Sequence, residues 1–288
     1  DIKNLNEQKV KLIGDCVLTA SFLSYTDAST REFRSELIYM PCVGDLLERK
    51  VPLTTPFNLE NLLTTDAIKQ GWTAKGLPAD EHSIQNGMLT TKASRFPLCI
   101  DPQQQAVSWI KNTYGKDLKI KTLAESDFMK HLELAVQFGN PFLFENVDEE
   151  LDPMIDPILE KNHYVEAGQK LIKLGDKVVS WDDGFRLFFT TKLGNPHYSP
   201  EVMAKTMLIN YSVTGDGLAN QLLNVVVAHE RPDLEQQYAE LVTEMSENAL
   251  LIVQLEDTLL RELSSSQGNI LDNEELIATL DETKTKAE

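Results

Sequence analysis

Apolar segments that alternate with helical patterns between residues 96 and 215 constrain the fold of this chain more than any other feature. The predicted strands are residues 96–100, 118–122, 142–144, 185–191 and 207–213. Helical patterns such as residues 127–138 separate them. Because parallel strands need long connections, usually helices, this order predicts a parallel α/β sheet. Ligands of such sheets bind at the edge where the strands end.

Turn and helix signals predict what surrounds the sheet. Residues 170–181 fit an antiparallel hairpin with a Gly-Asp turn, and Asn86-Gly87 predicts a turn before a short strand at 88–91. Helices are expected at residues 5–23, 30–38 and 58–70.

Three regions are predicted from these elements. Residues 1–92 would form N-terminal helices and a wrapping segment, residues 93–215 the α/β core, and residues 216–288 a helical extension.

The loop after the first predicted strand stands where P-loop proteins hold phosphate. A GxxxxGK[ST] loop uses glycines for close backbone approach, a lysine for the β and γ phosphates, and a hydroxyl for magnesium. The loop here contains none of these residue types: it consists of Asp101, Pro102, Gln103, Gln104, Gln105 and Ala106. We interpret it as a degenerate phosphate loop whose position fits but whose chemistry is missing.

The neighbouring strand ends are altered as well. In an active ATPase the strand at 142–144 would end in Asp-Glu, where the Asp helps to hold magnesium and the Glu activates water. Here the pair is Glu145-Asn146, and an amide cannot accept a proton as a general base. Thr191 or Asn195 could sense a γ-phosphate, but turn and cap hydrogen bonds are the favoured explanation for both. We predict no catalytic residue.

Charge and composition exclude several classes of function. A net charge of −18 argues against a nucleic-acid partner, because phosphate contacts need clusters of Lys and Arg. The three cysteines are isolated, which fits a reducing compartment, and the five histidines lack metal-ligand spacing. No apolar run approaches the length of a membrane span. We therefore predict no metal site, no nucleic-acid partner and no membrane partner.

A regular apolar seam follows the predicted core. From Leu234 to Leu259 its members recur in steps of four and three, the spacing of a coiled coil, with Asn248 as the one polar member. Residues 264–269 would break this helix, and Asp272 or Asn273 would cap another. We predict a helical hairpin and expect the chain to stop inside its second arm.

Motifs along essentially the whole chain resemble the dynein heavy chain family. They include Leu12-Ile13-Gly14-Asp15-Cys16, Gly76-Leu77-Pro78, Arg95-Phe96-Pro97-Leu98-Cys99, Glu145-Asn146-Val147-Asp148, Thr190-Thr191-Lys192-Leu193, Asn195-Pro196-His197-Tyr198 and Glu230-Arg231-Pro232. The match resembles the fifth AAA+ module of the motor ring with its buttress, or strut, coiled coil. It looks closest to axonemal inner-arm heavy chains.

This resemblance implies a fold, a role and a set of partners. The fold would be an AAA+ P-loop-type parallel sheet with flanking helices and a C-terminal coiled-coil hairpin. The module would be non-catalytic, would hold no cofactor, and would couple the ATPase ring to the stalk of a minus-end-directed microtubule motor. ATP and magnesium would act in other modules of the parent ATPase.

The implied partners are the neighbouring AAA+ modules and the stalk coiled coil. The microtubule and the dynein intermediate and light chains would be reached only through the parent motor. The implied location is cytoplasmic or cytoskeletal, in the axoneme of a cilium or flagellum.

Two alternatives remain open from the residues. The chain could be a regulatory module if residues 101–106 bind ADP in an unusual way, or an active ATPase, against which Glu145-Asn146 argues. Modules of AAA+ rings also offer a basic residue to the nucleotide of the module before them. Lys205, just before the last predicted strand, stands at that position, although a solvated lysine is the simpler interpretation.

Overall fold

The computed structural model describes residues 2–26, 28–166, 168–213 and 215–265. It divides into two compact units. The first contains the chain up to residue 64 together with residues 75–220, and the second contains residues 65–74 and the chain from residue 221.

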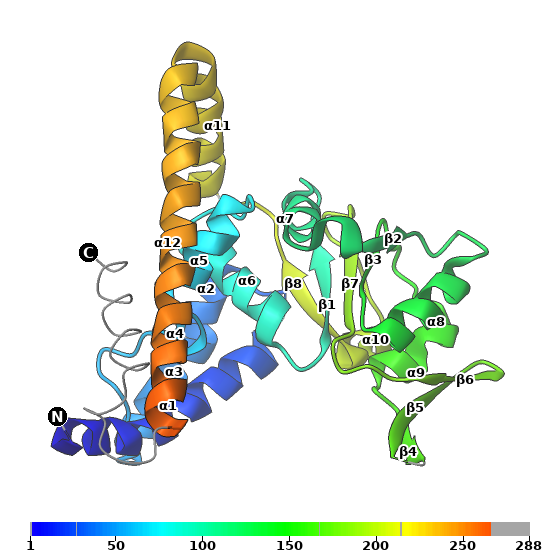
Figure 1. The fold of residues 1–288 in the computed structure, drawn as a ribbon, viewed down its shortest axis with the longest axis horizontal. Helices are drawn as coiled ribbons and strands as arrows, with labels where there is room; N and C mark the ends of the chain where they lie inside the picture. The colour runs from blue at the N-terminus through cyan, green and yellow to red at the C-terminus, as the bar shows by residue number, and fades with distance from the viewer. Residues whose placement is uncertain (1, 27, 167, 214, 266–288) are drawn as a thin grey trace. The chain divides into compact units, whose positions relative to one another are not determined.

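A five-stranded parallel sheet forms the centre of the first unit (Figure 1). Its strands are β1 (Phe96–Ile100), β2 (Lys119–Lys121), β3 (Pro141–Phe144), β7 (Arg186–Thr191) and β8 (Thr206–Asn210), in the order β2-β3-β7-β1-β8. All four neighbouring pairs are parallel. The central strands are apolar and almost fully buried, as expected for a parallel sheet covered on both faces. The predicted α/β fold is confirmed.

Helices connect these strands and cover the sheet. They are α6 (Glu81–Lys92), α7 (Gln105–Tyr114), α8 (Phe128–Phe138), α9 (Asp156–Leu159) and α10 (Pro200–Lys205), with 3₁₀ turns at Gly115–Asp117 and Pro153–Ile155. Helix α8 ends at Gly139, which has the left-handed φ of 70° that favours glycine. The predicted stop at Gly139 is therefore correct.

A separate antiparallel sheet lies in the chain between α9 and β7. It contains β4 (His163–Glu166), β5 (Gln169–Leu174) and β6 (Lys177–Ser180), in that order. The predicted hairpin corresponds to β5 and β6. Strand β4 was not predicted, because its four residues are all exposed and give no alternation of apolar and polar positions.

The N-terminal part of the first unit is helical, as predicted. It contains α1 (Ile2–Tyr25), α2 (Arg31–Phe33), a π-helical segment (Arg34–Tyr39), α3 (Met40–Glu48) and α4 (Leu59–Leu63). Gly14 of α1 donates its backbone N–H to Pro52 O at 3.1 Å, and Asp15 accepts two hydrogen bonds from Thr54. The Gly-Asp pair thus fastens the extended segment after α3 onto α1.

Two predictions in this region are wrong. Residues 88–91 are the end of helix α6 rather than a strand. Asp80 caps this helix by accepting from Ser83 N, and Asn86 is a buried helical residue rather than a turn residue. The single helix expected at 58–70 is two helices, α4 and α5 (Asp66–Ala74), although Asn58 does cap α4.

The second unit contains α5, α11 (Gly215–Glu230) from residue 221, and α12 (Pro232–Ser265). Helix α5 packs against α12. Pro232 occupies the first turn of α12, where a missing N–H costs nothing, and the chain reverses direction between α11 and α12 (Figure 1). The predicted second arm, residues 266–288, lies outside the described residues.

Candidate functional site

The strand order brings the predicted loop and the two strand ends to one edge of the sheet, whereas Lys205 directly precedes the parallel strand β8 and is therefore at the opposite edge. Strand β7 lies between β1 and β3, with Cys99 beside Thr190 and Phe144 beside Phe189. The three strands are parallel, so Asp101 and Glu145, which follow β1 and β3, lie at the same edge as Thr191, the last residue of β7. The backbone N–H of Asp101 donates to Thr191 O at 2.9 Å. This is the edge where ligands bind in open α/β sheets.

The degenerate phosphate loop is closed by its own first residue. The Asp101 side chain is almost fully buried, and its Oδ1 accepts from Gln105 N at 2.8 Å while Oδ2 accepts from Val107 N at 3.0 Å. Burial raises the pKa of Asp101, although main-chain N–H groups of Gln104 and its three successors favour the ionised form. Gln104 has a left-handed backbone with φ of 61°.

The Glu145-Asn146 pair offers no unpaired carboxylate that could activate water. Glu145 Oε1 lies 2.7 Å from Lys111 Nζ, so the carboxylate is neutralised by a cation from α7. Asn146 is exposed and has a φ of 54°, a conformation that Asn tolerates better than most residues. Its amide carries no group that could activate water.

The two sensor-like residues occupy different environments. Thr191 is buried at the end of β7, and its Oγ1 accepts from Leu193 N at 3.2 Å. Asn195 is exposed in the following loop. The observed hydrogen bond of Thr191 is a turn contact, in agreement with the simpler explanation, and a sensor role for either residue stays a prediction.

Lys205 at the end of α10 is enclosed by carboxylates of its own module. Its Nζ lies 2.9 Å from Asp156, 3.3 Å from Glu160 and 2.7 Å from Glu201. Hydrogen bonds to these carboxylates raise the pKa of Lys205. To reach a nucleotide of another module, the ammonium group would first have to leave these three partners.

Similarity to known proteins identifies the family of this chain. Residues 70–288 match a family described as the ATP-binding dynein motor region. The chain is 58% identical over its full length to the dynein-1-alpha heavy chain of the flagellar inner arm I1 complex of Chlamydomonas reinhardtii. It is 54% identical, also over its full length, to human dynein axonemal heavy chain 10. The chain belongs to the dynein heavy chain family.

The dynein relatives are much longer than this chain, which spans 6% of the length of each. A more distant relative, the dynein gamma chain of the flagellar outer arm of C. reinhardtii, is 42% identical over 99% of the chain. The relatives with the higher identities have axonemal or flagellar names, which supports the predicted cytoskeletal location in a cilium or flagellum.

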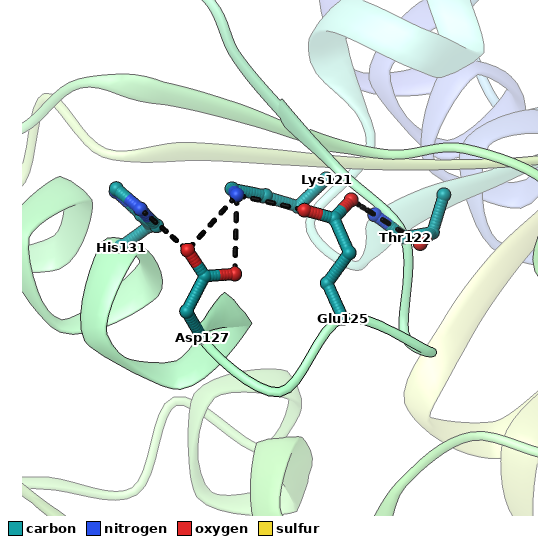
Figure 2. Close-up of polar contacts among 5 residues, drawn as sticks. All are labelled: Lys121, Thr122, Glu125, Asp127 and His131. Atoms are coloured by element: carbon teal, nitrogen blue, oxygen red, sulfur yellow. Dashed lines mark hydrogen bonds and ion pairs between the residues drawn. The ribbon is translucent and has the colours of Figure 1, made fainter.

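A cluster of charged residues after β2 was not predicted from the sequence (Figure 2). Lys121, at the end of β2, donates to Glu125 Oε2 at 2.7 Å and to both carboxylate oxygens of Asp127. These bonds lower the pKa of Glu125 and Asp127 and raise that of Lys121. His131 Nε2 lies 3.2 Å from Asp127. The group fastens the loop between β2 and α8, and its spacing gave no known motif.

A buried polar network was also missed. Arg34 donates to Asn86 Oδ1 at 2.8 Å, and Asn86 donates in turn to Asn210 O at 2.7 Å. His82 Nε2 lies 3.2 Å from the same carbonyl. Burial lowers the pKa of Arg34 to about 10 and also lowers the pKa of His82. The network ties the π-helical segment and α6 to the end of β8, and contacts this distant along the chain leave no local pattern.

Within the described residues, no group of three His, Cys, Asp or Glu side chains is arranged to hold a metal ion. None of the described helices has the length and apolar character needed to cross a membrane.

Proposed function

We propose that this chain is a non-catalytic AAA+ module, the fifth of a dynein motor ring, which transmits movement between the ATPase ring and the microtubule-binding stalk. The observation that carries the proposal is the composition of the loop at 101–106, which has no Gly, Lys, Ser or Thr to hold phosphate groups and magnesium. The family is described as ATP-binding, but the loop at 101–106 lacks the residue types that bind phosphate groups.

The other strand ends support the same conclusion. An ATPase needs a carboxylate that activates water, and Asn146 stands at that position. The remaining carboxylate, Glu145, forms an ion pair with Lys111. ATP hydrolysis would therefore require both phosphate-binding residues in the loop at 101–106 and a free carboxylate after β3.

The second unit supports a role in contact with other proteins. Helices α11 and α12 expose large apolar side chains that include Leu222, Val225, Tyr238, Leu241 and Ile252. Contiguous exposed apolar surface in a water-soluble protein usually marks an interaction site. We propose the stalk coiled coil as the partner of α12, because its seam has coiled-coil spacing.

Movement would be transmitted by displacement of whole elements. The five-stranded sheet is closely packed and acts as one body, so a displacement imposed by neighbouring modules would reach the helices that follow β8. The parent would be a minus-end-directed motor whose other modules use ATP and magnesium. The microtubule and the intermediate and light chains would then be partners of the parent motor.

Nucleotide binding by the isolated 288-residue chain tests the proposal. Calorimetric titration with Mg-ATP and with ADP should show no saturable binding in the micromolar range, and phosphate release should equal a buffer blank. Micromolar affinity for ADP without turnover would establish the regulatory module instead. Turnover above the blank would establish an active ATPase.

A further inference from the structure

We propose that the Asp101 carboxylate is a built-in anion that occupies the phosphate position of the loop, and that this occupancy excludes phosphate groups. The inference rests on the proposed function and deepens it. The loop would have kept its anion-binding backbone and acquired a permanent occupant.

The backbone around Asp101 has the form of an anion-binding site. Successive N–H groups near a helix N-terminus make a concavity that favours negative charge. The N–H groups of Gln105 and Val107 are 2.8 Å and 3.0 Å from the two oxygens of Asp101. The left-handed conformation of Gln104, with φ of 61°, turns the loop so that these groups face the carboxylate.

Ordinary helix capping does not describe this arrangement. A capping Asp directly precedes the helix, as Asp80 does before α6, where it accepts from Ser83 N. The residue directly before α7 is Gln104, whose side chain makes no capping bond. Asp101 lies three residues further back, at the end of β1, and its side chain reaches across the loop.

The carboxylate already accepts from the N–H groups that a phosphate would need. Asp101 is 1% exposed, so its carboxylate is buried rather than open to solvent. A phosphate would have to displace the carboxylate from the same N–H groups and then lie beside a like charge of low hydration. Occupancy therefore excludes phosphate groups more strongly than the absence of glycines and lysine alone.

Removal of the carboxylate tests this inference directly. We would replace Asp101 by Ser or by Gly in the 288-residue chain and titrate each variant with inorganic pyrophosphate, following heat and thermal stability. Ser is small and can still cap one N–H group, so D101S is the variant expected to keep the fold. D101S should bind pyrophosphate at least ten times more tightly than the parent chain.

Asp80→Ser is the matched control, because it removes a carboxylate from another helix N-terminus. Its pyrophosphate affinity should equal that of the parent. A folded D101S that binds no more tightly than the parent, or an equal gain in D80S, would overturn the inference. Either result leaves the proposed function intact as long as the parent binds no nucleotide, so the two failures are distinguishable.

Hydrogen exchange of the parent chain covers the case in which both Asp101 variants fail to fold. Slow exchange of the Gln105 and Val107 amides at neutral pH would support permanent occupancy. Fast exchange at both amides would show that the carboxylate does not hold them and would overturn the inference.

Discussion

The sheet of the first unit buries its apolar side chains, whereas the helices of the second unit expose many of theirs. Phe144 of β3 is fully buried, with its ring stacked on Phe189 at 5.4 Å and edge-on to Phe128 at 5.7 Å. Leu241 of α12 is 57% exposed, although its place in a regular seam is equally clear from the sequence. The same residue class therefore stabilises the first unit from within and stays available for contact in the second.

This difference shows which part of the chain can be understood alone. Burial of apolar surface stabilises the sheet without any partner, because the helices that connect its parallel strands also cover its faces. A long helix with an exposed apolar stripe gains little from folding by itself, because most helical stability comes from packing. The exposed residues of the seam on α12, such as Leu241 and Ile252, therefore contribute little to the stability of this chain alone.

Truncation of a ring in the core should give the largest effect. Phe144→Ala should lower the free energy of unfolding by about 3–5 kcal/mol, the usual cost of removing a fully buried aromatic ring. Leu241→Ala is the contrast and should change it by less than about 0.5 kcal/mol, as at other exposed positions. Urea unfolding of both variants measures the difference. Equal losses would show that α12 is packed within the chain in solution.

A smaller loss is expected where α1 meets the extended segment. A Cβ atom at Gly14 would lie 2.4 Å from Pro52 O, a backbone atom that cannot move aside cheaply. Gly14→Ala should therefore destabilise the chain by about 1–3 kcal/mol, as overpacking does. Gly44→Ala in α3 is the control, since nothing lies within 4 Å of a Cβ there. The control should be neutral or stabilising by up to about 1 kcal/mol because Ala favours helix. Thermal unfolding that ranks the two variants the other way would contradict the contact.

The buried network should make stability depend on pH. Burial and the nearby Arg34 lower the pKa of His82, while the hydrogen bond to the Asn210 carbonyl and the charges of Asp80 and Glu32 act in the opposite sense. A lowered pKa means that the unfolded chain takes up the proton more readily. The contribution of the neutral His82 to the free energy of unfolding is therefore complete above the unfolded histidine pKa of about 6.5. It is lost as the pH falls through the lower pKa of the folded state.

His82→Gln should remove this part of the dependence. The unfolding midpoint in urea, followed between pH 7.5 and 5.5, should fall less steeply in the variant than in the parent. Identical slopes would mean that His82 is not held neutral in the folded chain.

The seam should have the smallest effect on folding and a clear effect on coupling. Replacing Leu241 and Ile252 by Ala should leave the melting of the isolated chain nearly unchanged, because both side chains are exposed. In a complete motor the same pair should weaken the link between ATP turnover and microtubule affinity. Parallel measurement of basal and microtubule-stimulated ATPase checks this. A stimulation ratio and an affinity equal to those of the parent would exclude α12 as a transmission element.

Most strand positions and some helix ends were predictable, while the partners of buried side chains were not. Apolar runs or alternation predicted β1, β2, β3, β7 and β8, and a Gly-Asp turn signal predicted the hairpin of β5 and β6. Asn86-Gly87 was misread as a turn, because the partners of Asn86 are Arg34 and Asn210, far away in the sequence. Likewise, the composition of the loop at 101–106 indicated that phosphate binding is lost. It could not show that the Asp101 carboxylate accepts hydrogen bonds from Gln105 N and Val107 N.

The turn between β5 and β6 offers a practical route to following this module in a working motor. Gly175 has a φ of 58°, nothing lies within 4 Å of a Cβ there, and the neighbouring Asp176 is exposed. Both strands belong to the small antiparallel sheet, so an inserted peptide or an attached fluorophore would leave the hydrogen bonds of the five-stranded sheet intact. A reporter at this turn would record displacement of the first unit and would change no residue of the loop at 101–106 or of α12.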